Sequence, residues 1–493
     1  MKDRGSGPDR GETSGSRESA ATEASEPRIN LPLIRGLTLL GTVALVVGNM
    51  VGTSLYTLPA SLADVAGPFG LVAWLFTATG YLFVALVYAR LGTRYPRTGG
   101  PYVFARAAFG DFAGFITVWS YWVSTVVGNA AIVTGAVGYL VGFFPVLEHS
   151  VVGRFALAQV LLWGLCLLNV RGIKQSARVE TTVMFINLVP LGLLAIFTLR
   201  KFDMANLHPF APHGFGSLAA AAALVVWAYS GIESATVPAE EVQAPERTIH
   251  LGTMLGYGVG TAIFLLTALA VSGSLPNATI AGSARPIALA AEHAVGPWAG
   301  AVIGVAAVAA ALGTLNGWIL MAGRIPLSAA ADGIFFRPLA AVHPRYGTPA
   351  TALVVGTAVS SAMLLLYFSH SLLSVFNWIV LLAVLLTLLP HLFATGAEIK
   401  LGGQEEQAVG GRRWAATNGD AEGVAPVPDI TVPRSRSRVA PRVIAVIAFV
   451  FVLYTIYGVG LSVILWGLVL LLAGMPFYFA LRRGGRQTVV GSR

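Results

Sequence analysis

Long apolar stretches separated by short polar segments dominate the chain between residues 36 and 481. Most of them are close to the roughly 20 residues that a helix needs to cross the hydrocarbon core of a bilayer. We count twelve of them, near residues 36–63, 70–90, 111–145, 151–170, 180–199, 216–239, 251–275, 297–323, 349–369, 372–396, 441–457 and 459–481. The pattern therefore predicts an all-α polytopic membrane protein with 12 transmembrane helices.

Composition supports this fold class. Of the 493 residues, 55% are hydrophobic and 11% carry a formal charge, whereas a soluble globular protein has about 25% charged residues. This excludes a soluble enzyme with a peripheral anchor. It also excludes an outer-membrane barrel, whose alternating strands give a weak hydropathy signal. The single cysteine, Cys166, allows neither an intramolecular disulfide nor a cysteine-based metal cluster.

The distribution of the positive charge indicates the orientation in the membrane. The net charge is +9, but the basic residues lie in short segments between apolar stretches and not on one face of a soluble module, so we expect no nucleic-acid partner. By our count, 28 of the 32 Lys and Arg residues fall in the tails and in the segments after even-numbered helices. The positive-inside rule then places both termini in the cytoplasm. We expect a multi-pass protein of the plasma (inner) membrane.

The polar segments divide the chain into five parts. Residues 1–30 have no apolar core of a signal peptide, and their Ser, Gly, Glu and Arg content predicts a disordered cytoplasmic tail. Residues 31–398 form a predicted ten-helix transport core, and residues 399–440 a cytoplasmic loop. The predicted helices 11 and 12 occupy residues 441–482, and a second cytoplasmic tail follows at 483–493.

One acidic residue stands out within an apolar stretch. Glu233 lies in the sequence VVWAYSGIESATVPAEE, whereas nearly all other acidic residues between Leu37 and Ala397 lie in loops or near the ends of helices. An ionisable group at membrane depth is a functional candidate by default. A carboxyl group that faces a water-filled cavity can bind and release a proton. The alternative is a protonated Glu233 that makes a hydrogen bond in helix packing.

Two apolar stretches contain residues that favour an interrupted helix. Gly48 and Gly52 occur in VVGNMVGTSLYTLP, and Gly231 occurs among hydroxyl residues in WAYSGIES. Gly52 and Gly231 lie 179 residues apart, which fits a five-plus-five inverted repeat with discontinuous helices 1 and 6. Free N–H groups at the end of a half-helix can hold a carboxylate, and free carbonyl groups can hold an ammonium. Two interrupted helices therefore suit an α-amino acid, which carries both groups. The alternative is close packing of the GxxxG type at Gly48 and Gly52.

An amide and two indoles complete the candidate site. Asn129 lies in SYWVSTVVGNAAIV, where the sequence has little other polar character. Trp227 and Trp318 lie away from obvious interface positions. Although Trp is typical of the membrane interface, an indole beside a substrate cavity can gate access or stack on a cation. No GxxxxGK[ST] motif is present, so transport would be driven by gradients or by exchange.

Four motifs together resemble the amino acid–polyamine–organocation transporters. They are GNMVGTSLYTLPASLADVAGP, the segment Tyr121–Asn129, WAYSGIESATVPAEEVQAPERTI and NGWILMAGRIPLSAAADGIFF. Within this superfamily the chain most resembles the arginine/agmatine antiporter branch of the basic amino acid/polyamine antiporters. The resemblance covers about residues 35–480. It implies alternating access, with no enzymatic activity, cofactor or metal.

The resemblance also implies roles for individual residues. Backbone N–H groups of Thr53 and Ser54 would bind a substrate carboxylate, and carbonyl groups of Met50, Trp227 and Ser230 would bind the α-ammonium. Asn129 would hydrogen-bond a guanidinium, and Trp318 would contact a cationic side chain. Tyr121 and Trp227 would act as gates, and Glu233 would be linked to the proton. The expected substrate-binding set is Asn49, Met50, Gly52, Thr53, Ser54, Asn129, Trp227, Ser230, Gly231 and Trp318.

Some positions depart from that branch. Ser54 replaces the second Gly of a G-S-G motif, Ile132 stands where a Met is expected, and Ala228 stands where a Ser is expected. Some proton-coupled relatives carry a Lys within helix 5, but no ionisable residue occurs between Glu180 and Arg200. This favours exchange, or a proton role centred on Glu233.

The leading hypothesis is a secondary active amino-acid permease that exchanges a cationic amino acid for its amine product. A proton-coupled symporter of neutral amino acids is the first alternative, and a transporter-derived sensor is the second. A membrane-embedded enzyme is disfavoured because the eight His residues are scattered. The expected partners are a small amino acid or amine and the lipid bilayer, and a homodimer is an open question.

Overall fold

The structure, a computed structural model, describes residues 32–402, apart from 142, 284 and 370–371, and residues 439–487. The predicted tails at 1–30 and 483–493 and the predicted loop at 399–440 lie wholly or mostly outside these described residues. The helices are α1 (Leu39–Met50), α2 (Thr53–Val65), α3 (Gly70–Arg94), α4 (Pro101–Phe109), α5 (Asp111–Val141), α6 (Val151–Val170), α7 (Ile173–Thr198), α8 (Leu218–Tyr229), α9 (Pro245–Ser274), α10 (Asn277–Ala281), α11 (Pro286–Val295), α12 (Trp298–Ala331), α13 (Ala350–Ser369), α14 (Leu372–Leu401), α16 (Val439–Val459) and α17 (Leu461–Gln487).

Within the described part, eleven helical segments are long and apolar enough to cross a membrane. The prediction of an all-α fold is confirmed. The expected helix at 349–369 is α13, whose described apolar part, Ala350–Leu365, is shorter than these spans. The short helices α4, α10 and α11 were not predicted, because each lies in a connection between long apolar stretches.

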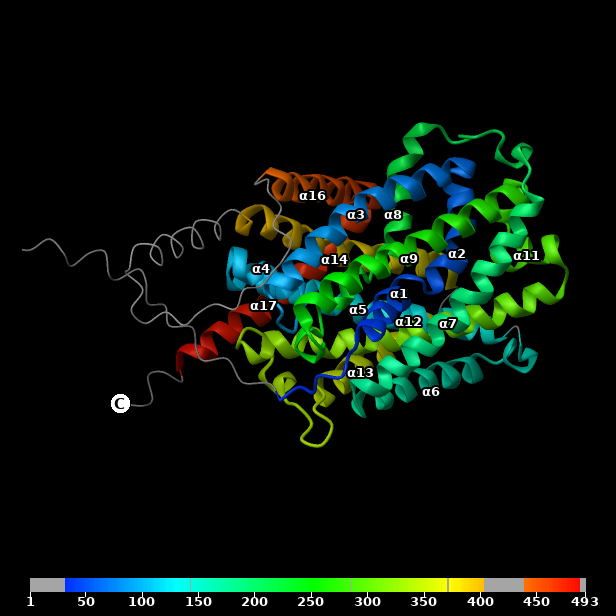
Figure 1. Ribbon diagram of the computed structural model, residues 1–493. Coiled ribbons are helices and arrows are strands. Elements are labelled where there is room, and N and C mark those ends of the chain that lie inside the picture. Colours follow the sequence, from blue (N-terminus) through cyan, green and yellow to red (C-terminus); the bar gives the residue numbers. More distant parts are fainter. Residues whose placement is uncertain (1–31, 142, 284, 370–371, 403–438, 488–493) are drawn as a thin grey trace, which may run out of the picture.

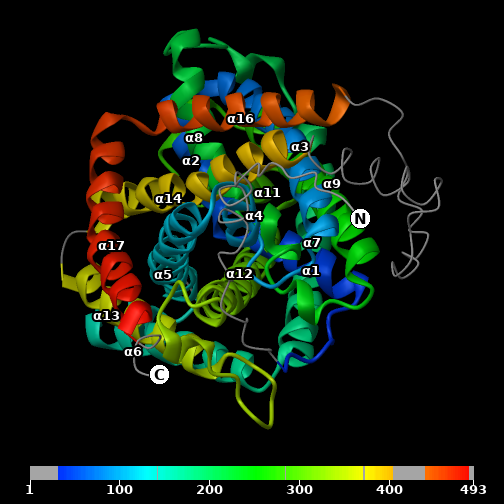
Figure 2. The same ribbon diagram turned by 90° about the vertical axis from the view of Figure 1, so that its left-hand side faces the viewer.

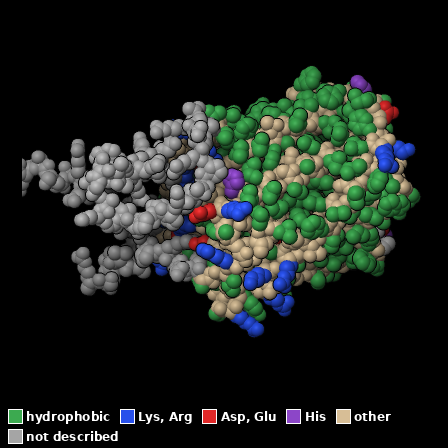
Figure 3. All heavy atoms as spheres, in the orientation of Figure 1, with side chains coloured by type: hydrophobic (Ala, Val, Ile, Leu, Met, Phe, Trp, Pro, Cys, Tyr) green, Lys and Arg blue, Asp and Glu red, His purple; other side chains and the backbone are tan. Residues whose placement is uncertain are grey.

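Most helices run side by side along the molecule (Figure 1). Seen from one end, α5 and α12 run through the middle, and α6, α13, α16 and α17 lie on the outside (Figure 2). α12 contacts both α5 and α7, while α1 contacts α7 and α9. Hydrophobic side chains cover most of the visible face, and Lys and Arg gather mainly at one end (Figure 3). This surface suits a protein surrounded by hydrocarbon.

Two of the long helices are interrupted where the sequence predicts it. α1 ends at Met50 and α2 begins at Thr53, with Gly52 between them. α8 ends at Tyr229 and is followed by the 3₁₀ turn η6 (Ile232–Ala235). Gly231 has φ +110°, a conformation that residues with a Cβ rarely adopt. Backbone groups freed in this way are tolerated at membrane depth only inside protein or beside a cavity.

At one end of the molecule, hydrogen bonds and an ion pair hold together the segments next to these interruptions. The backbone N–H groups of Gly36 and Leu37 donate to the carbonyl of Glu241 at 2.9 and 3.0 Å, and the N–H of Gln243 donates to Leu37. The guanidinium of Arg324 in α12 forms a bidentate pair with the carboxylate of Glu241, and both side chains are buried. The chain before α1 is therefore fixed to the chain that follows α8.

Candidate substrate site between the interrupted helices

A small cavity lies where the interrupted helices meet α5 and α12. Its volume, counted as the space open to the centre of a water molecule, is about 20 Å³. A cavity of this size holds about one water, so an amino acid can enter only if the surrounding helices move apart. The lining residues are Asn49, Gly52, Thr53, Ser54, Ile132, Trp227, Ser230, Thr314 and Trp318.

The ends of three half-helices supply opposite partial charges around this cavity. α2 begins at Thr53 with Gly52 as its N-cap, and no side chain caps it. The first N–H groups of a helix lack intrahelical acceptors and attract anions. α1 and α8 end beside the cavity, at Met50 and Tyr229, where the negative ends of the two helix dipoles attract cations. The arrangement can hold a carboxylate and an ammonium group at the same time.

Two glycines allow the half-helices to come this close. A Cβ on Gly52 would collide with the side chain of Thr314, and a Cβ on Gly231 would lie 2.6 Å from the Cβ of Asn49. Gly231 therefore brings the end of α8 against the end of α1. Both positions require glycine because neighbouring atoms occupy the space of a side chain.

The part of the cavity formed by α5, α8 and α12 carries aromatic and amide groups. The ring of Trp318 meets the ring of Tyr121 edge-on, with centroids 6.4 Å apart. Trp227 is half-buried, and its indole lies 3.9 Å from the position of a Cβ on Gly128. Asn129 is 1% exposed, and its Oδ1 accepts no hydrogen bond from the described residues. A buried acceptor without a donor is costly.

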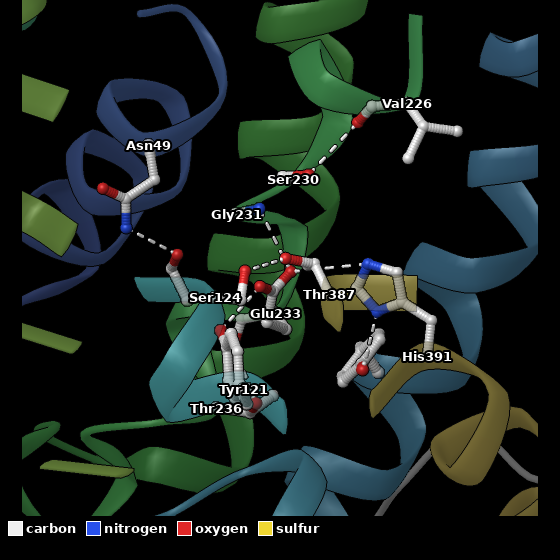
Figure 4. A network of polar contacts seen from close by, with 12 residues as sticks. Asn49, Tyr121, Ser124, Val226, Ser230, Gly231, Glu233, Thr236, Thr387 and His391 are labelled. Atoms are coloured by element: carbon white, nitrogen blue, oxygen red, sulfur yellow. Dashed lines mark hydrogen bonds and ion pairs between the residues drawn. The ribbon is translucent and has the colours of Figure 1, made fainter. Parts of the chain in front are cut away.

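Glu233 lies at the centre of a polar network next to the cavity (Figure 4). It is fully buried. The Tyr121 hydroxyl donates to Oε1 at 2.6 Å, and the Gly231 N–H donates to Oε2 at 3.1 Å. His391 Nε2 lies 3.9 Å from Oε2, while its Nδ1 is 2.9 Å from the hydroxyl of Tyr88. The network connects η6 to α3, α5 and α14.

The structure brings most of the predicted substrate-binding residues together. Asn49, Gly52, Thr53, Ser54, Trp227, Ser230 and Trp318 line the cavity, whereas Met50, Asn129 and Gly231 do not. Met50 points its side chain toward Gly260, and its carbonyl accepts hydrogen bonds from Gly52 N–H at 3.0 Å and from the Ser54 hydroxyl at 3.4 Å. Asn129 lies one turn before Ile132 on α5. Gly231 contacts Glu233 and Asn49.

Two residues of this region were not predicted from the sequence. Thr314 lines the cavity, and its hydroxyl donates to the carbonyl of Gly48 at 2.7 Å. The sequence gives only a weak indication of this role, because Thr314 is a single Thr four residues before Trp318. The prediction that Glu180 lies at the edge of a helix is wrong, because α7 begins at Ile173 and Glu180 is 1% exposed. Glu233 is therefore not the only carboxyl group buried between the long helices.

The described residues contain no group of three His, Cys, Asp or Glu side chains that could hold a metal ion. The fold and the site together define a multi-pass membrane protein with a small cavity between interrupted helices, which is the architecture of a secondary transporter. Residues 37–467 match the amino acid permease family. The chain belongs to this family, whose members are transporters and not enzymes.

Curated relatives agree with this assignment. The chain is 30% identical over 390 residues to the putative arginine/ornithine antiporter of Bacillus subtilis, covering 73% of this chain and 82% of the relative. It is 30% identical over 365 residues to the cadaverine/lysine antiporter of Escherichia coli, covering 72% and 81%. It is 27% identical over 354 residues to a putrescine transporter of Haemophilus influenzae, covering 71% and 80%. The chain is similar to carriers of basic amino acids and polyamines.

Proposed function

We propose that the protein exchanges a cationic amino acid for its amine product across the membrane by alternating access. The observation that carries this proposal is that the N-terminus of α2, at Thr53 and Ser54, which no side chain caps, lines the same small cavity as the indole of Trp318. One group suits a carboxylate and the other suits a cation. A cationic amino acid carries both.

The amine product of such an amino acid lacks the carboxylate but keeps the cationic end. It would therefore use Trp318 and Asn129 and leave the N-terminus of α2 unoccupied. Asn129 supports this interpretation because its buried Oδ1 lacks a donor, and ammonium and guanidinium groups have only donors to offer. The names of the relatives from Bacillus subtilis and Escherichia coli, arginine/ornithine and cadaverine/lysine antiporters, also favour exchange of basic substrates.

Alternating access is supported by the small size of the cavity, which holds about one water. A substrate therefore needs a rearrangement of the helices, and the buried pair of Arg324 and Glu241 is a contact that such a rearrangement could break. We propose that 12 helices, ten of them in a five-plus-five inverted repeat, rearrange around this cavity. The basic end in Figure 3 would face the cytoplasm together with both termini.

Symport of a neutral amino acid with a proton is the second candidate. It is favoured by Ile132, an apolar residue in the cavity wall, which offers nothing to a charged side chain. Glu233 would then carry the coupled proton. The two candidates differ in the substrate side chain and in the need for a substrate on the opposite side.

Counterflow in liposomes separates the candidates. Labelled arginine should enter vesicles that contain agmatine and should not enter empty vesicles. The matched experiment offers labelled alanine to empty vesicles under a pH gradient. Arginine uptake that requires internal amine supports exchange. Failure of counterflow for arginine, ornithine and lysine, together with alanine uptake driven by the pH gradient, would overturn the proposal.

A further inference from the structure

A second buried carboxyl group lies behind the cavity, on α7. Glu180 is 1% exposed. Its Oε1 accepts one hydrogen bond, from Asn316 Nδ2 at 2.9 Å. Its Oε2 has no hydrogen-bond partner, and the side chain takes part in none of the ion pairs among the described residues. A buried ionised carboxylate with one donor and no counter-ion is strongly unfavourable.

The surroundings of Glu180 come from three helices, and within the described part of the chain they contain no titratable group. Gly48 of α1 and Gly313 and Gly317 of α12 lie against its carboxyl group: a Cβ on Gly313 would be 3.6 Å from Oε2, and one on Gly317 would be 2.9 Å from Oε1. The cations of its own helix, Lys174 and Arg178, are exposed. The carboxyl group therefore lies in a tight neutral pocket at the junction of α1, α7 and α12.

Asn49, which lines the cavity, also lies against Gly317. Asn49 Nδ2 donates to the hydroxyl of Ser234 at 2.7 Å, while its Oδ1 lies beside Gly317 and has no donor. Asn49 is 3% exposed. Two buried oxygen atoms, Oδ1 of Asn49 and Oε2 of Glu180, thus have no donor among the described residues, and both side chains lie against Gly317.

Asn316 cannot supply the missing hydrogen bonds, because its amide is already used. Its Nδ2 donates to Ser176 Oγ at 3.0 Å as well as to Glu180, and its Oδ1 accepts from Asn169 at 2.9 Å. A proton on the carboxyl group removes the buried charge and creates the donor that Asn49 lacks.

We propose that Glu180 is a proton-binding site of this transporter, separate from Glu233 and coupled to the substrate cavity through Asn49. The proton comes from water and returns to water, so that the group alternates between a neutral acid and a carboxylate. The protonated acid donates toward Asn49 Oδ1. After proton release the carboxylate favours the opposite amide orientation, with Nδ2 turned toward Glu180 and away from Ser234. Because Asn49 lines the cavity, the substrate meets a different polar surface in each state.

A proton suits this pocket better than a metal cation. The three glycines bring the backbones of α1 and α12 so close to the carboxyl group that a Cβ on Gly48 would collide with Oε2. A metal ion needs several oxygen ligands at 2 Å or more, whereas a proton needs no additional volume. The inference does not depend on which amino acid is transported.

Infrared spectroscopy of the reconstituted protein at neutral pH tests the inference without any transport measurement. The C=O stretch of a protonated carboxyl group is distinct from the bands of a carboxylate. Glu180→Gln should remove one such band, whereas Glu148→Gln, which changes an exposed loop carboxylate, should leave it in place. An unchanged band in Glu180→Gln would overturn the proposal.

A second variant tests the proposal if Glu180→Gln does not fold. Asn49→Ala retains the acid and removes its acceptor, so the frequency of the Glu180 band should shift. An unshifted band would contradict the coupling through Asn49. In liposomes that exchange substrate, Glu180→Gln should also weaken the dependence of flux on pH. A wild-type protein that shows the band but no exchange would refute the proposed function and leave this site intact.

Discussion

The hydroxyl of Tyr121 donates a 2.6 Å hydrogen bond to Glu233, and the ring of the same Tyr121 meets the indole of Trp318 edge-on. One side chain therefore contacts both the cavity wall and the buried carboxyl group. A change in the charge of Glu233 alters the partner of Tyr121, and a substrate that displaces Trp318 alters its packing. Tyr121 thus gives one direct physical connection between the cavity wall and Glu233.

Glu233→Gln should flatten the pH dependence of flux while leaving substrate binding largely intact. Glutamine keeps the size of the side chain and can still accept from Tyr121, but it cannot gain or lose a proton. Flux is measured across a series of pH values, and binding is measured separately at one pH. Glu148→Gln is the matched control on an exposed loop. A Glu233→Gln protein with the wild-type pH profile would exclude Glu233 as the proton-linked group.

Trp318→Leu should weaken a cationic substrate more than a small neutral one. The expected difference is about 1–2 kcal/mol if a desolvated cation contacts the indole face. Dissociation constants for arginine and alanine, measured on the same preparation, give the comparison directly. An equal loss for both substrates would mean that Trp318 only packs against Tyr121.

Gly52→Ala should destabilise the protein and impair substrate binding, because the added Cβ collides with Thr314. Overpacking of this kind typically costs about 1–3 kcal/mol. Thermal unfolding in detergent measures the cost, and the double variant with Thr314→Ala should recover part of it. Gly138→Ala in α5 is the control, since nothing lies within 4 Å of a Cβ there. If Gly52→Ala is as stable as Gly138→Ala, the close approach of the helices is not as described.

Glu241→Gln should strongly lower the stability of the folded protein. It leaves the guanidinium of Arg324 buried without its counter-ion, and breaking a buried pair costs about 3–5 kcal/mol. The double variant Glu241→Gln with Arg324→Gln should be more stable than the single one. Glu292→Gln, which breaks a pair with the 61% exposed Arg285, should cost about 1 kcal/mol or less. Similar unfolding temperatures for the two single variants would contradict this assignment.

The sequence was sufficient to predict the long helices and both interruptions. Apolar stretches of about 20 residues have few other stable solutions in a bilayer. Gly52 and Gly231 were informative because glycine weakens a helix while hydroxyl neighbours offer alternative hydrogen bonds. Both are confirmed at the ends of half-helices, and seven of the ten predicted substrate-binding residues line one cavity.

The burial of Glu180 could not be predicted from the sequence. It follows Arg171, Lys174 and Arg178, so charge density suggested a loop, yet α7 begins at Ile173 and continues past it. Its burial depends on glycines of α1 and α12 that are more than 130 residues away in either direction. Thr314 could not be predicted as a cavity residue for a similar reason, because only the packing of α12 against α1 brings its hydroxyl to Gly48. Contacts of this kind arise from tertiary packing and leave no local pattern.

An experimental structure with bound arginine tests the central claim most directly. We predict that the α-carboxylate lies against the N–H groups of Thr53 and Ser54, while the guanidinium lies between Trp318 and Asn129. The carboxylate and ammonium positions should be shared by any amino acid that binds. Arginine bound elsewhere, or with its guanidinium at the N-terminus of α2, would contradict the account.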